Sequence, residues 1–307
     1  MELKALNDLT KVLNEISEEV SSRLKELEAL GEEIASSGIA IVAKPRANNE
    51  GVAGVDGSRA KICSIGSISI YIAKAVAIPV KPPSKPIEVA EVFAIDDYVD
   101  EYSEGCAEDY MLFLEAKLYG ATNAKYVFID GPLIDPPRPQ LRCSKSLVSD
   151  LHAFRAKAIS SLIRSDRVAI GIVKKLVGSL KGIPATLAYR VVCSSVAKRL
   201  GIENANELLL AIPYDRKLAP EEVLEPYRSI PISSFVVCNP RRKSVLRIDV
   251  APSDKCLEAL SLLASLPKSD SGEPLPIALA HELSKVPKTL LNILRSRVER
   301  YLLELTP

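Results

Sequence analysis

The sequence predicts an α/β protein built on a mixed β-sheet, and three observations support this class. Apolar runs rich in Val and Ile, such as 51–56, 67–80 and 125–129, have the composition of strands. Between such runs lie segments whose apolar residues recur every three or four positions, as they do in helices. Two of the runs end in an acid followed by glycine, at Asp56 and Asp130, so we expect a carboxylate at the end of each strand.

The stretch Gly51–Arg59 is the first of these runs. Val52 and Val55 suit a buried strand, and Gly57 is expected to take the positive φ needed just after Asp56. A carboxylate at a strand end is held by the sheet yet faces the space beyond it, where ligand sites are often built. The same residues also fit an ordinary Asp-Gly hairpin turn, so other acids must accompany Asp56 to make a site.

Length and composition limit the class of protein. A chain of 307 residues can form one large core or two domains, and 40 Lys and Arg balance 39 Asp and Glu, so a nucleic-acid surface must be a local patch. Two methionines and no tryptophan beside many charged residues favour a thermophile. The six cysteines form no Cys-x-x-Cys pair, so we expect buried apolar residues rather than zinc ligands, with a disulfide left open for a hyperthermophile.

No membrane segment is expected. The N-terminus is charged and lacks the short apolar core of a signal peptide. The most apolar window, 62–80, contains Lys74 and several serines, which favours paired strands over a membrane span. We therefore expect a cytoplasmic protein.

The N-terminal segment is predicted to be one long amphipathic helix. Its apolar positions recur at steps of three and four: Leu6, Leu9, Leu13, Ile16, Val20, Leu24, Leu27, Leu30 and Ile34. Such a helix either docks a partner or packs on its own domain. We expect this helix to occupy residues 1–45 and the remaining domain to occupy 46–307.

Strands and helices then alternate. Strands at 51–56, 61–65 and 67–80 would form an antiparallel meander before a proline-rich loop at 81–86. A helix at 106–119 follows, and a strand at 125–129 ends at Asp130. A second proline-rich loop (132–139), a helix (144–164) and a strand (167–173) complete the series. This order, β-β-β-α-β-α-β, matches the ribonuclease H-like fold over about residues 50–180.

The remaining chain is predicted to add a hairpin and helices to this core. We expect helices at 184–200, 204–211, 276–286 and 288–305, and strands at 235–238 and 245–249. The turn between these strands, 239–244, is basic and either contacts a phosphate backbone or is simply solvated.

The predicted order brings acids together. In the ribonuclease H-like fold the first strand, the first helix and the fourth strand converge, which here places Asp56, Glu115 and Asp130 on one spot. Oxygen ligands of this kind hold Mg²⁺ or Mn²⁺, and a pair of ions can activate water and stabilise the leaving oxygen of a phosphodiester. His281 could ligate an ion or move a proton, and Lys174 could neutralise a phosphate. Equally, His281 fits a buried core histidine, and Lys174 fits a lysine that ends a strand at solvent.

Four motifs in order resemble one known family, the NurA nucleases of archaea. They are Val55-Asp56-Gly57-Ser58, Phe128-Ile129-Asp130-Gly131-Pro132-Leu133, Val168 to Lys174, and Pro274 to His281. The resemblance runs from about residue 50 to the C-terminus. It implies a Mn²⁺-dependent DNA exonuclease, 5′-to-3′, and single-strand endonuclease. It also implies a ring-like homodimer, fed by a hexameric HerA-type ATPase during DNA end resection for recombination.

The resemblance also assigns residues. Asp56 and Asp130 match the family's strand aspartates, His281 matches its late histidine, and Glu115 matches its helix acid, for which Glu108 on the same face is a substitute. The family commonly has a tyrosine eight residues before the histidine, where this chain has Glu273. Glu273 could ligate metal itself or take over a positioning role, or it could mark reduced activity.

Two other functions compete with a nuclease. An actin-like phosphotransferase would need a second lobe with repeated phosphate loops, and neither a repeat of the Asp-Gly strand nor a Gly-x-x-x-x-Gly-Lys-Ser motif is present. A NurA-like scaffold that has lost its chemistry would keep the fold and the ATPase contact, and Glu273 is the feature that favours it.

Overall fold

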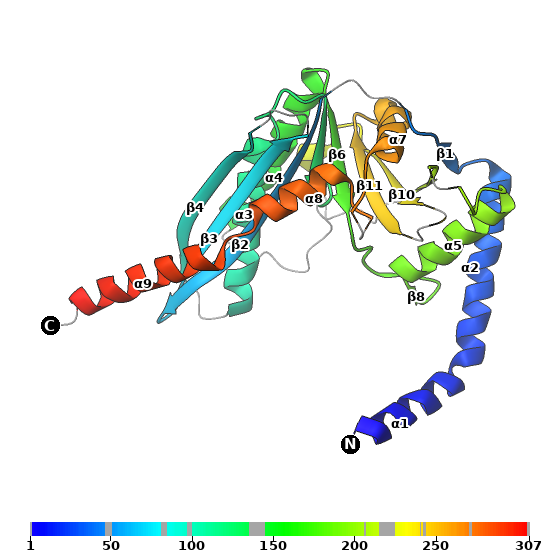
Figure 1. The fold of residues 1–307 in the computed structure, drawn as a ribbon, viewed down its shortest axis with the longest axis horizontal. Coiled ribbons are helices and arrows are strands. Elements are labelled where there is room, and N and C mark those ends of the chain that lie inside the picture. The colour runs from blue at the N-terminus through cyan, green and yellow to red at the C-terminus, as the bar shows by residue number, and fades with distance from the viewer. Residues whose placement is uncertain are drawn as a thin grey trace.

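The described residues form one large mixed sheet covered by helices on both faces (Figure 1). This computed structural model describes residues 2–46, 51–80, 85–96, 100–134, 145–205, 207–214, 225–239, 241, 244–269 and 272–305. The nine strands of the sheet lie in the order β1-β9-β10-β11-β6-β5-β2-β3-β4. Their bounds are β1 (Ile41–Ala43), β2 (Val52–Ile65), β3 (Ile68–Pro79), β4 (Ile87–Asp96), β5 (Tyr126–Asp130), β6 (Val168–Val173), β9 (Leu209–Pro213), β10 (Ser233–Cys238) and β11 (Val245–Ala251).

The helices complete two further layers. Their bounds are α1 (Glu2–Glu15), α2 (Ser17–Ser37), α3 (Asp100–Leu118), α4 (Lys145–Arg164), α5 (Ala185–Arg199), α7 (Cys256–Ser265), α8 (Leu275–Ser284) and α9 (Lys288–Leu305). Helices α7 and α8 cover one face, which receives Phe128 and Ile170. The opposite face receives Ile129 and Ala169 under α3 and α4, and it continues under α2 and α5 across β9 and β10.

The half of the sheet made by β4, β3, β2, β5 and β6 confirms the predicted ribonuclease H-like fold. Strands β2, β3 and β4 are an antiparallel meander, β5 is parallel to β2, and β6 is parallel to β5. Strands β11, β10, β9 and β1 then extend the sheet antiparallel from β6. Since two parallel neighbours end at the same edge, this topology can place acids from β2 and β5 side by side.

The predicted bounds of the meander are wrong in two respects. The strands expected at 51–56 and 61–65 are a single strand, β2, which pairs with β3 without a turn after Asp56. Gly57 accordingly does not take a positive φ and lies within extended backbone. The third strand is β4, beyond the proline-rich segment; its alternating burial is typical of a strand with one face on the core. Asp56 therefore lies within a strand, although it directly follows the last residue of β2 that pairs with β5.

In the C-terminal half, one element was predicted wrongly and another was not anticipated. The helix expected at 204–211 is absent from the described residues of this segment, because Leu209–Pro213 forms strand β9 between β1 and β10. Its apolar run is fully buried there, and this tertiary pairing decides its conformation. Helix α7 was not anticipated. The hairpin of β10 and β11 is confirmed, whereas half of its basic turn (240, 242 and 243) lies outside the described residues.

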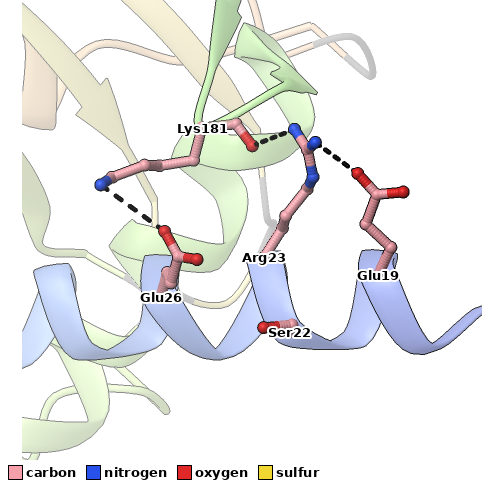
Figure 2. Close-up of a pocket in the computed structure, with 5 residues that line it drawn as sticks. All are labelled: Glu19, Ser22, Arg23, Glu26 and Lys181. Carbon is pink, nitrogen blue, oxygen red and sulfur yellow. Dashed lines mark hydrogen bonds and ion pairs between the residues drawn. The ribbon is translucent and has the colours of Figure 1, made fainter.

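The predicted N-terminal helix is divided into α1 and α2, which meet at Ile16. Helix α2 packs on α5 so closely that a Cβ at Gly31 would collide with Ser195. Helix α2 also contacts the hairpin of β7 (Ser179–Leu180) and β8 (Ile183–Pro184), as Figure 2 shows. The Arg23 Nη1 donates a hydrogen bond to the Lys181 carbonyl at 3.1 Å, and Glu26 forms an ion pair with the Lys181 Nζ at 3.5 Å. The division of the chain at residues 1–45 and 46–307 stays a prediction, and β1 from the first segment pairs with β9.

A disulfide joins Cys193 on α5 to Cys238 on β10. The sequence left a disulfide open as an alternative to buried free cysteines, and for these two residues the disulfide is observed. Cys256 is a buried free thiol, as expected of an apolar core residue. None of the described helices has both the length and the apolar character required to traverse a membrane.

Candidate metal centre

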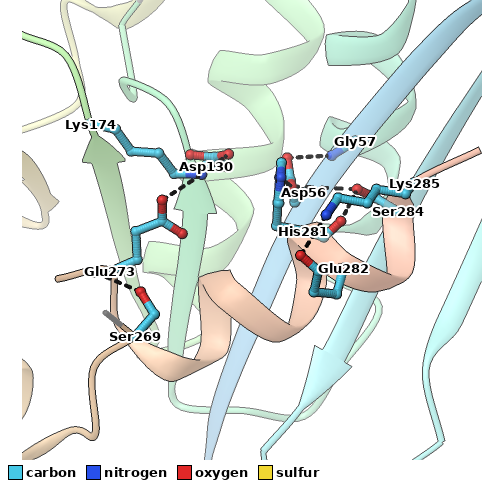
Figure 3. Close-up of polar contacts among 10 residues, drawn as sticks. All are labelled: Asp56, Gly57, Asp130, Lys174, Ser269, Glu273, His281, Glu282, Ser284 and Lys285. Carbon is cyan, nitrogen blue, oxygen red and sulfur yellow. Dashed lines mark hydrogen bonds and ion pairs between the residues drawn. The ribbon is translucent and has the colours of Figure 1, made fainter. Parts of the chain in front are cut away.

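Two aspartates of neighbouring parallel strands face the same side of the sheet. The last residues paired between β2 and β5 are Val55 and Ile129, so Asp56 and Asp130 occupy equivalent positions one residue further on. Side chains alternate along a strand, and Val55 and Ile129 pack under α3 and α4. Asp56 and Asp130 therefore point to the opposite face, where α8 lies (Figure 3).

Helix α8 brings His281 to these aspartates because it lies directly on β2. A Cβ at Gly54 would come within 2.0 Å of the Pro276 carbonyl oxygen, so only glycine permits this approach. The His281 Nδ1 lies 2.9 Å from the Asp56 Oδ2. When Nδ1 carries the proton, His281 donates this hydrogen bond and its Nε2 keeps a lone pair for a ligand.

Asp56 is the most enclosed member of the group. Its Oδ1 accepts a hydrogen bond from the Gly57 amide at 2.7 Å, and its Oδ2 accepts one from the Ser284 hydroxyl at 3.4 Å. Burial and the nearby charge of Asp130 raise the pKa of Asp56 to about 6, although the hydrogen bond with His281 opposes this shift. Ser284 was not anticipated from the sequence; it lies three residues after His281 on the same helix, which is the only signal that could have indicated it.

The three side chains have the arrangement of a divalent-cation site. Ligand atoms of Asp56, Asp130 and His281 all lie within 4.8 Å of one another. Two carboxylates this close repel each other, and this repulsion adds to burial in raising the pKa of Asp56, so a cation between them would relieve it. Carboxylate oxygens suit Mg²⁺ and Mn²⁺, and an imidazole nitrogen is better suited to Mn²⁺. The residues present therefore fit a divalent metal ion.

Lys174 and Glu273 lie beside Asp130. Lys174 follows β6 by one residue, and its Nζ is 2.9 Å from the Asp130 Oδ2 and 3.5 Å from the Glu273 Oε1. Burial lowers the pKa of Lys174, but Asp130, Glu273 and Asp56 outweigh burial and raise it above its usual value. The structure thus brings five of the six candidate residues, all except Glu115, into one network.

Glu115 approaches from the other face of the sheet. It is buried on α3, and its Oε1 would lie 2.7 Å from a Cβ at Gly57. Gly57 therefore admits the Glu115 carboxylate next to Asp56, although Glu115 is outside the group of three ligands found among the described residues. Glu108, the alternative helix acid, instead pairs with Arg59 at 3.6 Å and is half-exposed.

A buried network behind Asp130 was also missed. The fully buried Asp249 on β11 accepts hydrogen bonds from the Leu133 amide (3.1 Å), the Ser234 hydroxyl (2.6 Å) and the Arg247 guanidinium (3.1 Å). Arg155 on α4 donates to the Pro132 carbonyl at 3.0 Å. These bonds fix the turn that follows Asp130. The signal in the sequence was an acid in the middle of an apolar strand.

Removing the charge of Asp56 should stabilise the metal-free protein. The folded-state pKa of about 6 exceeds the ordinary 3.8, so the folded protein binds more protons between these values and loses stability as the pH rises through them. We expect Asp56→Asn to raise the unfolding free energy at pH 7 by roughly 1–3 kcal/mol, and the gain to vanish near pH 4. Thermal unfolding in chelator between pH 4 and pH 7 measures this change in stability. Asp166→Asn, at an exposed position, should not raise the stability.

Asp249→Asn should lower the unfolding free energy by about 2 kcal/mol, because it leaves the part-buried Arg247 guanidinium and the buried Leu133 amide with a weaker acceptor. Chemical denaturation measures this loss. An unchanged midpoint would show that the turn after Asp130 is held by other contacts.

Comparison with known proteins assigns the chain to a family. The family described as NurA domain matches residues 50–286. The crystal structure of the NurA nuclease from Sulfolobus solfataricus is similar over 98% of this chain and 97% of that chain, with 14% identity and a TM-score of 0.66. The solved Ciona intestinalis endonuclease V bound to an inosine-containing DNA has 19% identity and a TM-score of 0.38, covering 89% of this chain and 98% of that chain. No curated protein matches the sequence. Because the family match spans most of its length, the chain belongs to the NurA domain family.

Proposed function

We propose that this protein is a metal-dependent DNA nuclease. The observation that carries the proposal is the group of Asp56, Asp130 and His281, whose ligand atoms lie within 4.8 Å of one another on a ribonuclease H-like sheet. Family membership supports the same conclusion, since a member with a similar fold is described as a nuclease.

We assign the metal to Asp56, Asp130 and His281. Glu115, whose carboxylate lies beside Gly57 on the other face of the sheet, is the candidate for an additional ligand. A bound divalent metal would supply a water of lowered pKa and positive charge for the phosphodiester oxygens, and a two-ion arrangement is the form we favour. Three bonds prepare the protein for this role. His281 and Ser284 hold the Asp56 Oδ2, and the Gly57 amide holds the Oδ1.

Lys174 is the residue that we assign to the substrate phosphate. Its Nζ is 2.9 Å from Asp130, and its side chain is part-buried, so a phosphate oxygen at the metal would lie within its reach. The DNA backbone would otherwise be held by charge alone, and binding should weaken steeply with salt and show little sequence preference.

The finer features of this proposal follow from the family. They are Mn²⁺ as the preferred metal over Mg²⁺, a 5′-to-3′ exonuclease and single-strand endonuclease, and a homodimer that works with a hexameric HerA-type ATPase. The process would be DNA end resection in the recombinational repair of a thermophilic archaeon, in the cytoplasm.

Digestion of end-labelled DNA tests the function. The purified protein should degrade single- and double-stranded substrates in Mn²⁺, more slowly in Mg²⁺, and not at all in chelator. Adding a HerA-type ATPase with ATP should speed digestion of duplex ends. A folded wild-type protein that cleaves neither substrate in any metal, with or without the ATPase, would instead support a scaffold role.

A further inference from the structure

Lys174 lies between two acids. Its Nζ is 2.9 Å from the Asp130 Oδ2 and 3.5 Å from the Glu273 Oε1, and Figure 3 shows the lysine reaching Asp130 beside Glu273. All three side chains are part-buried, so these attractions are screened less than those of an exposed pair. The ammonium therefore has two competing partners.

One of these partners belongs to the metal group. An ammonium held at Asp130 neutralises a ligand that a metal ion needs, and it places a positive charge where a divalent cation would approach. Lys174 is consequently an internal competitor of the metal ion.

The other partner is fixed in place by its backbone. The Glu273 amide donates to the Ser269 hydroxyl at 3.2 Å, and the Glu273 carbonyl accepts from the Ser269 amide at 2.9 Å. Leu275 donates to the Pro267 carbonyl at 2.8 Å, which closes the same turn at the start of α8. Among the described residues Glu273 is not in the group of possible metal ligands. Its carboxylate is thus held beside the site without entering it.

We propose that Glu273 is a positioning residue that draws Lys174 away from Asp130 and thereby raises the affinity of the site for a divalent cation. When a cation takes Asp130, Glu273 remains as the acceptor for the displaced ammonium. The inference rests on the proposed metal site, and it assigns a role to the glutamate that stands eight residues before His281.

Titration of the metal-free protein with Mn²⁺ by isothermal calorimetry tests the proposal without any DNA. Glu273→Gln should weaken Mn²⁺ binding roughly tenfold, the usual order for a residue that acts through a ligand's neighbour. Lys174→Met should tighten binding, because it removes the competing ammonium. In the Lys174→Met background the same Glu273→Gln change should cost less than about threefold, since no ammonium remains to be drawn away.

Glu26→Gln is the matched control. Glu26 also pairs with a lysine at 3.5 Å, Lys181, but it lies on α2, which packs on α5 rather than on the strands of the site. The Glu26→Gln substitution removes one negative charge, as Glu273→Gln does, and should leave the Mn²⁺ affinity unchanged. An equal loss from Glu273→Gln with and without Lys174 would overturn the proposal and make Glu273 a direct ligand. Failure of the wild-type protein to bind Mn²⁺ would overturn the proposed function itself.

Discussion

Replacing Asp56 by asparagine should reduce metal-dependent DNA cleavage by at least about 10³-fold, because a ligand worth several kcal/mol of charge stabilisation is lost. The side chain keeps its shape, so the hydrogen bonds from His281 and Ser284 can persist and the protein should remain folded. Single-turnover digestion of end-labelled DNA in saturating Mn²⁺ measures the rate, and calorimetry measures the accompanying loss of Mn²⁺ binding.

Asp166→Asn is a suitable control for this experiment. Asp166 pairs with Lys125 at the protein surface and is not part of the metal group. Its replacement should leave the cleavage rate within about twofold of wild type, since surface changes are usually neutral. Cleavage by Asp56→Asn at the wild-type rate would show that the chemistry occurs elsewhere in the chain.

Gly54→Ala should lower the unfolding free energy by about 3 kcal/mol, at the upper end of the cost of overpacking. The new methyl group would lie 2.0 Å from the Pro276 carbonyl oxygen and 2.4 Å from its carbon, and these are backbone atoms that no side-chain rotation can move. Helix α8 must therefore shift away from β2. Chemical denaturation in chelator measures the loss of stability.

The same shift should separate His281 from Asp56, so the variant should also bind Mn²⁺ more weakly. Gly120→Ala is the matched substitution, because a Cβ there would meet nothing within 4 Å. It should change stability by less than about 0.5 kcal/mol. Equal stability of the two variants would mean that α8 does not lie as closely on β2 as the structure shows.

Local patterns were sufficient to bring Asp56 and Asp130 together. Each acid follows an apolar run and precedes a glycine, and the order of elements makes their strands parallel neighbours. What the patterns could not indicate was tertiary. Nothing local distinguishes a turn at Gly57 from extended backbone, because the choice depends on pairing with β3 and on the approach of Glu115.

The same limit explains the other differences. Residues 209–212 are buried on both faces of the sheet and show no polar alternation, so this short apolar run fits a helix as well as a strand. Glu115 was expected beside the aspartates, yet a helical periodicity does not tell which face of the sheet the helix covers. Ser284 contacts Asp56, and Asp249 contacts Leu133, across long stretches of sequence, so the local signals at these residues do not identify those partners.

The position of the aspartates within the sheet has a consequence for their dynamics. β2 and β5 are interior strands: β3 and β4 lie on one side of the pair, and β6, β11, β10, β9 and β1 lie on the other. Fraying begins at the outermost strands, β4 and β1, where backbone groups pair on one side only. Hydrogen exchange should therefore be slowest around Val55 and Ile129. The two carboxylates should therefore keep their separation when either edge strand opens locally.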